Sequence, residues 1–214
     1  MKLLLLPGDG IGPEVLAEVR RVIDGLNAHH GLGLNVENGD IGGASLDRHG
    51  TPLAPHVLEM AKASDAVLMG AVGGPKWQGV SYELRPEQGL LNLRKGLGLY
   101  ANLRPALCFP ALADASTLKR EIIDGLDILF VRELIGGVYF GEPRGIETLS
   151  DGTKRGFNTQ SYTTPEIERV ARMAFDLARQ REGRVCSVEK ANVMESGLLW
   201  RETVTALHAR EYGD

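Results

Sequence analysis

The feature that most constrains the fold is an alternation of strand-length apolar runs with helical patterns in the N-terminal half of the chain. Lys2–Leu6, Leu32–Val36 and Asp65–Val72 have the length and apolar content of strands. Between them, apolar residues recur at helical spacing over Val15–Leu26, and Pro55–Ala63 has the length of a short helix. Continuous apolar runs are typical of strands that are covered on both faces. The pattern predicts an α/β fold, with an open, largely parallel sheet and helices on both faces.

The C-terminal half follows a less regular pattern. Strands are predicted over Tyr100–Leu107, Asp127–Arg132, Val138–Phe140 and Arg184–Val188. Asp151-Gly152 is a hairpin signal between two short polar-apolar stretches. Helices are predicted after Thr163 and over Ser196–Arg210. The change of pattern places a domain boundary near residue 99, which separates residues 1–99 from residues 100–214.

Charge and apolar content exclude several classes of protein. The chain has 28 acidic and 24 basic residues, a net charge of −4, which argues against a nucleic-acid-binding face. The first apolar run stops at Pro7, too soon for a signal peptide, and no run approaches the roughly 18 residues of a membrane span. Cys108 and Cys186 form neither a CxxC motif nor a disulfide framework. We therefore expect a cytoplasmic protein without nucleic-acid or membrane partners.

Glycine is enriched, with 27 residues among 214, and part of the excess lies in two clusters that each follow a predicted strand. The first cluster has Gly8, Gly10 and Gly12, a GxGxG spacing rather than the GxGxxG of dinucleotide-binding turns, and no GK[ST] follows it. The second cluster spans residues 70–74. Loops at the carboxyl ends of parallel strands are where ligands bind in open α/β sheets. The alternative is that both clusters are only tight turns between strand and helix.

Three arginines lie within or beside apolar segments. Arg94, Arg104 and Arg132 could each hold a carboxylate through two parallel hydrogen bonds. Lys190 ends an apolar run and is more often a solvated charge than a base, and Tyr139 is more often a core residue than an acid. The five histidines show no metal-ligand spacing. The alternative for each arginine is an internal salt bridge, with Glu87, Glu133 or Glu142 as partner.

Five ordered stretches make a family resemblance visible. They are PGDGIGPE (7–14), GAVGGPKW (70–77), RPEQGLLNLRKGLGLYANLRP (85–105), VRELIGGVYFGEPRG (131–145) and SVEKANVMESGLLWRE (187–202). Together they cover much of the chain, which resembles the isocitrate/isopropylmalate dehydrogenase family of β-decarboxylating enzymes. The resemblance implies a cofactor-binding first domain and a dimer-forming second domain with an arm near 151–162. It also implies an NAD-dependent oxidative decarboxylation of a 2-hydroxy acid that carries a 3-carboxylate.

The same resemblance assigns roles to individual residues. It implies that Arg94, Arg104 and Arg132 bind the substrate carboxylates. It further implies that Lys190 helps to deprotonate the substrate hydroxyl and that Tyr139 protonates the enol left after loss of CO2. The residues implied to lie near the nicotinamide end of NAD are Ile11, Ala71, Val72, Gly73, Gly74, Glu87 and Asn192.

Substrate choice in the family depends on the segment that holds Leu90 and Leu91. Two leucines near Glu87 would form an apolar pocket, which favours isopropylmalate, the substrate of leucine biosynthesis, over acids with a further carboxylate. Related activities on tartrate, malate or homoisocitrate are the alternatives.

The resemblance also implies features that lie outside this sequence. The family uses Mg2+ or Mn2+, and its aspartate ligands and adenosine-binding loop follow the position that matches Asp214. We therefore expect an amino-terminal fragment that is inactive alone, or a non-catalytic folding or dimerisation unit. In a homodimer with shared active sites, Lys190 would serve the partner's site. We also expect exposed apolar surface, with Leu3–Leu6 and Val67–Val72 lacking sheet neighbours.

Overall fold

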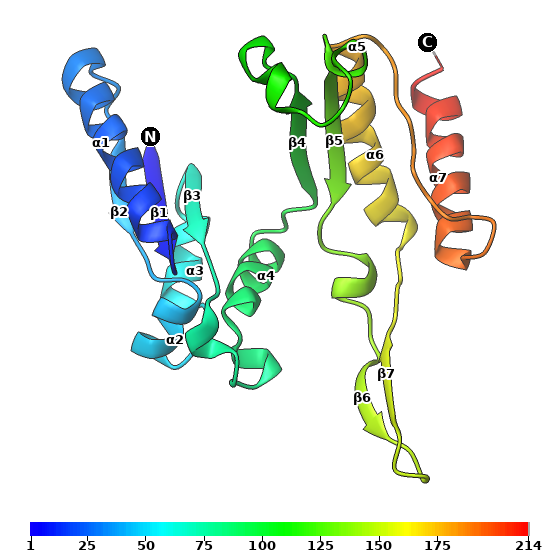
Figure 1. Cartoon of the computed structure of the whole chain (residues 1–214), viewed down its shortest axis with the longest axis horizontal. Helices are drawn as coiled ribbons and strands as arrows, with labels where there is room; N and C mark the ends of the chain where they lie inside the picture. Colours follow the sequence, from blue (N-terminus) through cyan, green and yellow to red (C-terminus); the bar gives the residue numbers. More distant parts are fainter. Residues whose placement is uncertain (214) are drawn as a thin grey trace. The chain divides into compact units, whose positions relative to one another are not determined.

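The computed structural model describes residues 1–213 and divides the chain into two compact units, Met1–Gly98 and Leu99–Asp214. Figure 1 shows the elements of each unit along the chain. The units are described separately below.

The first unit is a parallel three-stranded sheet with helices on both faces. Its strands are β1 (Lys2–Gly8), β2 (Asn35–Asn38) and β3 (Ala66–Ala71), in the order β2-β1-β3. Its α-helices are α1 (Gly12–His30), α2 (Gly43–His49), α3 (Pro55–Lys62) and α4 (Pro86–Gly96). Short 3-10 turns follow β3 at η1 (Pro75–Trp77) and η2 (Tyr82–Leu84). The predicted α/β class is confirmed for this unit.

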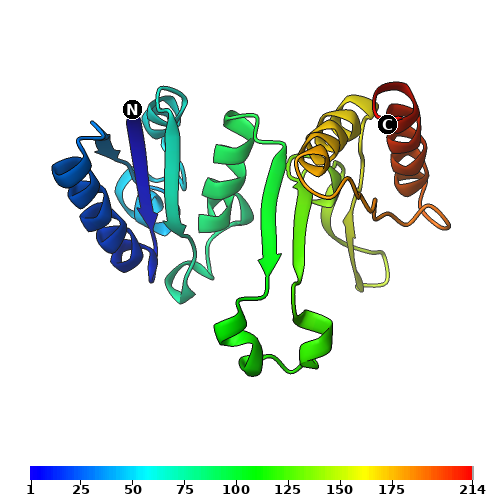
Figure 2. The same cartoon turned by 90° about the horizontal axis from the view of Figure 1, so that it is seen from above.

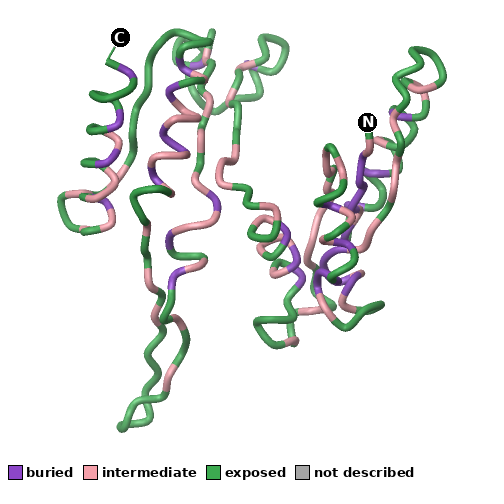
Figure 3. Tube along the Cα trace, turned by 180° about the vertical axis from the view of Figure 1, so that it is seen from behind, coloured by how far each residue is buried: buried purple, intermediate pink, exposed green. Residues whose placement is uncertain are grey.

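The apolar run of β1 forms the core because alternate side chains point to opposite faces of the sheet. Leu3 and Leu5 pack with Leu16 and Ile23 of α1. Leu4 and Leu6 pack on the other face with a cluster to which α3 and α4 contribute Val57, Ala61 and Leu93. Figure 3 shows this run as the continuous buried stretch of the unit.

The expectation that Leu3–Leu6 would lack sheet neighbours is wrong, because β1 is the middle strand and both of its edges are paired. β3 pairs on one side only, with β1, and its Leu68 is 38% exposed. The exposed apolar surface of this unit therefore lies at β3 and along α1, where Val15 and Val22 are also exposed.

β2 begins later than the predicted Leu32–Val36. The Leu34 N–H donates to Asn27 Oδ1 and the Asn27 side-chain amide donates to the Leu34 carbonyl, both at 2.8 Å. Gly31, at φ 61°, ends α1 in the left-handed conformation, and Gly33 has φ 63°. These residues belong to the turn that closes α1, so the strand starts at Asn35.

The second unit contains antiparallel pairs and two long helices. β4 (Ala101–Leu107) pairs with β5 (Asp127–Glu133), and β6 (Arg144–Thr148) pairs with β7 (Lys154–Asn158) in the predicted hairpin. The segment between β4 and β5 holds η3 (Pro110–Ala115) and α5 (Arg120–Ile123) and extends beyond the strand ends in Figure 2. α6 (Thr164–Arg179) and α7 (Glu195–Glu211) complete the unit.

α6 and α7 pack through an apolar cluster and an ion-pair network. Phe175 of α6 lies with Leu207 and Tyr212 in the buried cluster. Arg172 donates two hydrogen bonds to the Glu211 carboxylate, at 2.8 and 2.9 Å. Its neighbours Glu168 and Arg210 extend the network. These contacts hold the C-terminal helix on α6.

Two predicted strands are wrong. Val138–Phe140 lies in the 3-10 turn η4 (Gly137–Tyr139), because Gly137 at φ 73° turns the chain and the Gly141 N–H donates to its carbonyl. Arg184–Val188 is not assigned to any strand, and its residues are exposed. Its two valines, Val185 and Val188, suit a strand, but strand structure requires a paired neighbour.

Candidate active site

The glycine turn after β1 brings backbone rather than side chains to the end of the sheet. Gly8 and Gly10 have φ of 71° and 58°, which only glycine adopts readily. Gly12 lies against β3: a Cβ on it would be 2.7 Å from Ala71 N, and one on Gly70 would be 2.8 Å from Gly12 Cα. The turn must therefore be built of glycine at these positions.

Asp9 is the buried side chain that organises this turn. It is 3% exposed, and its carboxylate accepts hydrogen bonds from the N–H groups of Gly43 (2.7 Å), Ala44 (2.7 Å) and Gly73 (2.8 Å). The Asp9 N–H donates to the Ala71 carbonyl at 2.7 Å. Sequence reasoning did not single out Asp9, although an aspartate between two glycines after a strand was a visible signal.

Six of the predicted cofactor residues lie in the first unit. Ile11 is 60% exposed at the start of α1. Ala71–Gly74 follow β3, and Gly73 at φ 104° lies beside the first glycine turn, since its carbonyl is 4.0 Å from a Cβ built on Gly10. Glu87 Oε1 lies 2.8 Å from a Cβ built on Gly73. The structure therefore brings Ala71–Gly74 beside both the first turn and Glu87.

α4 places the predicted substrate residues of the first unit on one helical face. Glu87, Leu90, Leu91 and Arg94 have the i, i+3, i+4, i+7 spacing that shares a face. Leu90, Leu91 and Arg94 are each half-buried. The adjacent face of α4 is buried, and its Gly89 packs closely on the backbone of Pro52. A Cβ added to Gly89 would be 2.4 Å from the Pro52 carbonyl oxygen. This packing fixes the rotation of α4 and so the direction of the predicted face.

In the second unit, a groove of about 1470 Å3 is lined by four predicted site residues: Arg104, Arg132, Tyr139 and Lys190. In the β4–β5 register Arg104 pairs with Phe130 and Asn102 with Arg132, so both arginines lie on one face of the ribbon. The structure brings these four residues together on one concave surface.

The two groove arginines are exposed, although each belongs to an apolar segment of the sequence. The Arg104 Nε–H donates to Asn102 Oδ1, and the Arg132 guanidinium lies 5.6 Å from the Tyr139 ring centroid. Glu133, one of the salt-bridge partners considered above, pairs instead with Arg169 at 3.7 Å. The guanidinium groups of Arg104 and Arg132 are therefore accessible to a ligand carboxylate.

A buried carboxylate supports the turn that carries Tyr139. Glu133, with a side chain 3% exposed, accepts the N–H groups of Ile135 at 3.0 Å and Gly136 at 2.8 Å. Tyr162 packs on the next glycine, because its hydroxyl lies 2.4 Å from a Cβ built on Gly137. Burial raises the pKa of Tyr162, and the Glu133 charge raises it further. Sequence reasoning missed this support, since it depends on long-range packing.

Lys190 lies on an extended segment that α7 holds in place. A Cβ on Gly197 would be 2.7 Å from the Lys190 carbonyl carbon. Trp200 Nε1–H donates to Ser187 Oγ at 3.1 Å, and Arg201 pairs with Glu189 at 2.6 Å and lowers the pKa of that carboxyl. Asn192, the remaining predicted cofactor residue, is exposed two positions after Lys190.

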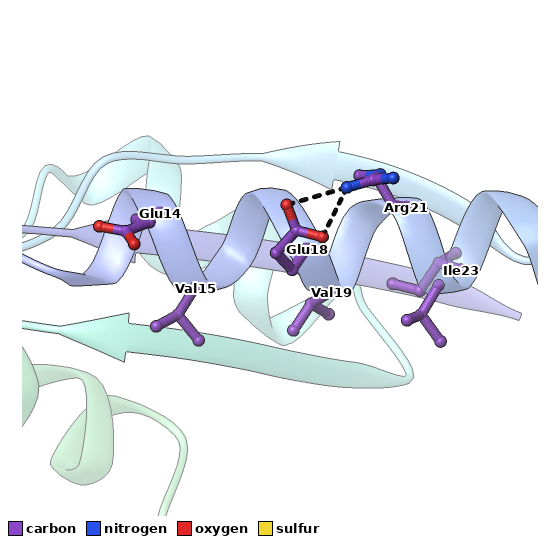
Figure 4. A pocket seen from close by; sticks show the side chains of 7 residues that line it. Glu14, Val15, Glu18, Val19, Arg21 and Ile23 are labelled. Carbon is purple, nitrogen blue, oxygen red and sulfur yellow. Dashed lines mark hydrogen bonds and ion pairs between the residues drawn. The ribbon is translucent and has the colours of Figure 1, made fainter.

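A second concavity, of about 760 Å3, runs along α1 and involves none of the predicted residues. Figure 4 shows Val15 and Val19 pointing the same way from the helix, with Glu18 bound to Arg21 at 2.9 Å beside them.

Within residues 1–213, no cluster of three or more His, Cys, Asp or Glu residues is arranged to hold a metal ion. None of the described helices has the length and apolar content to cross a membrane.

The comparison with known families agrees with this arrangement. The model of the isocitrate/isopropylmalate dehydrogenase family matches residues 2–214. The chain belongs to this family. A solved structure supports the same fold. The isocitrate dehydrogenase of Methylococcus capsulatus superimposes with a TM-score of 0.81 at 29% sequence identity. The superposition includes all of this chain and 58% of the isocitrate dehydrogenase chain.

The curated relatives within the isocitrate/isopropylmalate dehydrogenase family are more similar in sequence. The 3-isopropylmalate dehydrogenase of Caulobacter vibrioides is 66% identical over 212 residues, which are 99% of this chain and 59% of that protein. The 3-isopropylmalate dehydrogenase of Gluconobacter oxydans is 62% identical over 213 residues. The chain thus spans somewhat under three-fifths of the length of these relatives.

Proposed function

We propose that the protein oxidises and decarboxylates (2R,3S)-3-isopropylmalate to 4-methyl-2-oxopentanoate and CO2 with NAD, as a step of leucine biosynthesis. The observation that carries the proposal is the groove that Arg104, Arg132, Tyr139 and Lys190 line together. Two cations for carboxylates, one amine and one phenol are the groups that this reaction needs. The printed names of the 66% and 62% identical relatives support the choice of isopropylmalate.

The glycine-lined end of the first sheet fits a nicotinamide cofactor. Gly10 and Gly74 are exposed and carry no side chain, so a ligand can approach the backbone closely there. Ile11 and Glu87 would flank the nicotinamide end. When bound, NAD would accept a hydride from C2 of the substrate.

The groove residues would handle carboxylates and protons. Arg104 and Arg132 would each bind a substrate carboxylate by charge-assisted hydrogen bonds. The Lys190 amine would take the proton of the C2 hydroxyl as C2 is oxidised to a ketone. After CO2 leaves, the Tyr139 hydroxyl would return a proton to C3. Arg132, 5.6 Å from the Tyr139 ring, would stabilise negative charge that develops on the phenol.

Leu90 and Leu91 would form the pocket for the isopropyl group, because they lie on one face of α4 with Arg94. A branched apolar group is favoured there, whereas the further carboxylate of homoisocitrate would lose its hydration without a partner. Mg2+ or Mn2+ belongs to the proposal as well. Among the described residues, no group of three or more His, Cys, Asp or Glu side chains is arranged to hold it.

The proposal is tested with the complete gene product, by following NADH formation with isopropylmalate, NAD and Mg2+. We expect turnover, with Tyr139→Phe and Lys190→Met each reducing kcat by about 10²–10⁴-fold, the range for loss of a proton-transfer group. Lys119→Met, at an exposed lysine of the same unit, is the control and should retain full activity. Assaying residues 1–214 separately tests the alternative of a non-catalytic folding or dimerisation unit.

Other outcomes would refute the proposed substrate or the proposed roles. Preferential turnover of malate, tartrate or homoisocitrate would replace isopropylmalate with that acid. Absence of turnover with all four acids would refute the dehydrogenase proposal. Full activity of Lys190→Met would remove Lys190 from the mechanism.

We also propose a homodimer, in which two arrangements of the active sites can be told apart. The groove places Lys190 with Arg132 of its own chain, whereas shared active sites would have Lys190 serve the partner's site. The proposed mechanism predicts that the Lys190→Met variant and the Arg132→Ala variant are each inactive when purified alone. If Lys190 serves the partner's site, mixed dimers of the two variants contain one intact site and regain activity. If Lys190 acts within its own chain, the mixture stays inactive, because each site lacks one group.

A further inference from the structure

Asp9 connects three segments that are distant in sequence. Its carboxylate is buried at the end of β1 and accepts the N–H groups of Gly43 and Ala44, at the start of α2, and of Gly73, in the loop after β3. The three donor–acceptor distances are 2.7–2.8 Å. Hydrogen bonds of this length to an ionised acceptor are stronger than neutral ones.

Both carboxylate oxygens are needed for this arrangement. Oδ2 accepts from Gly43 and Gly73, and Oδ1 accepts from Ala44. An asparagine has a single acceptor oxygen, and its amide N–H2 would face at least one of the three donors. Gly42, at φ 75°, makes room for this carboxylate, since a Cβ there would be 2.4 Å from Asp9 Oδ2.

α2 also holds the far end of the same loop. Asp47 near the C-terminal end of α2 accepts hydrogen bonds from the Lys76 ammonium and from Trp77 Nε1, the latter at 3.1 Å. Gly43 allows the Trp77 ring to pack on α2, because a Cβ there would be 2.2 Å from the ring. The segment from Gly73 to Trp77 is thus held by Asp9 at its start and by α2 at its end, and Asp9 also binds the start of α2.

We propose that Asp9 is a positioning residue for the cofactor loop Ala71–Gly74, which it holds against the turn of Ile11 without touching substrate or cofactor. The inference rests on the proposed function, because it assigns the loop to NAD. Loss of the carboxylate would let Gly73 and α2 move away from the turn. Binding of NAD would weaken, whereas the groove of the second unit would be unaffected.

The experiment measures steady-state kinetics of the complete gene product and its Asp9→Asn variant below their melting temperatures. We expect KM for NAD to rise about tenfold, the effect of roughly one lost hydrogen bond, with KM for isopropylmalate unchanged. Val57→Ala is the matched control: Val57 is 1% exposed in the core of the same unit, so its truncation lowers stability without altering the loop. It should leave KM for NAD unchanged.

A second variant and a second measurement test the inference even if the Asp9→Asn variant does not fold. Asp47→Asn weakens the exposed attachment of the loop and should raise KM for NAD in the same direction by a smaller factor. Amide hydrogen exchange in residues 1–214 should accelerate at Gly73 in Asp9→Asn more than in Val57→Ala, whether or not the gene product has the proposed activity. Equal effects of Asp9→Asn and Val57→Ala would overturn the inference, as would a loss confined to kcat. Absence of turnover in the unmodified protein would instead refute the proposed function.

Discussion

Leu4→Ala is the sharpest test of the sheet order β2-β1-β3. Leu4 is fully buried on the middle strand, in register with Glu37 of β2 and Val67 of β3. The substitution removes three carbon atoms, worth about 0.8 kcal/mol each in transfer free energy, or about 2.4 kcal/mol. The residual cavity adds to this, because a core packed from both sides relaxes only partly. We expect a total loss of about 3–4 kcal/mol in the free energy of unfolding of the first unit.

The assay is the urea dependence of amide hydrogen exchange at β1, which reports the first unit separately from the second. Leu68→Ala is the matched control, since Leu68 is on β3 and 38% exposed. It should cost clearly less than Leu4→Ala, because more than a third of Leu68 already contacts solvent. If Leu4→Ala costs no more than Leu68→Ala, β1 is not the central strand and the account of the core is wrong.

Three further measurements test other parts of the structure. The two arginine partners of Glu211 lower its pKa from 4.5 to about 2, so its contribution is present above pH 4.5 and lost as pH falls towards 2. The melting temperature of Glu211→Gln should therefore lie below that of the unmodified chain above pH 4.5, and the difference should vanish near pH 2. In Gly43→Ala, the new Cβ would be 2.2 Å from the Trp77 ring, so the Trp77 fluorescence should shift to longer wavelength as the ring is displaced. In Gly25→Ala, the new Cβ has no atom within 4 Å, so the substitution should stabilise α1 by about 0.5–1 kcal/mol. Thr163→Ala should lower the free energy of unfolding by about 1 kcal/mol, as measured by thermal unfolding. The substitution removes the hydroxyl that donates a hydrogen bond to the Glu166 carboxylate at the start of α6.

The sequence was sufficient for features that depend on local patterns. Helical periodicity located α1 and α7, and Thr163 marked the start of α6, where its N–H donates to Glu166. The glycines of the first turn were identified from their spacing, and their positive φ angles explain why glycine is required.

Features that depend on distant partners could not be predicted in this way. Leu3–Leu6 were expected to lack sheet neighbours because the family resemblance implies further strands downstream of the position that matches Asp214. The structure instead pairs both edges of β1 with β2 and β3, which lie within the first unit. Arg184–Val188 has strand composition but no paired strand. Asp9 was passed over because its three donors come from residues 43, 44 and 73. Each error arises where a residue's role is set by a segment far along the chain.

The backbone contact between Gly12 and Gly70 bears on laboratory evolution of this protein. A substitution at one position cannot be compensated at the other, because glycine is already the smallest residue and the clash involves main-chain atoms on both sides. A mutant library that samples these two codons would mostly yield misfolded clones. Diversity is better placed at Leu90 and Leu91, which are half-buried and lie on one helical face, so new side chains can be accepted there without moving the sheet.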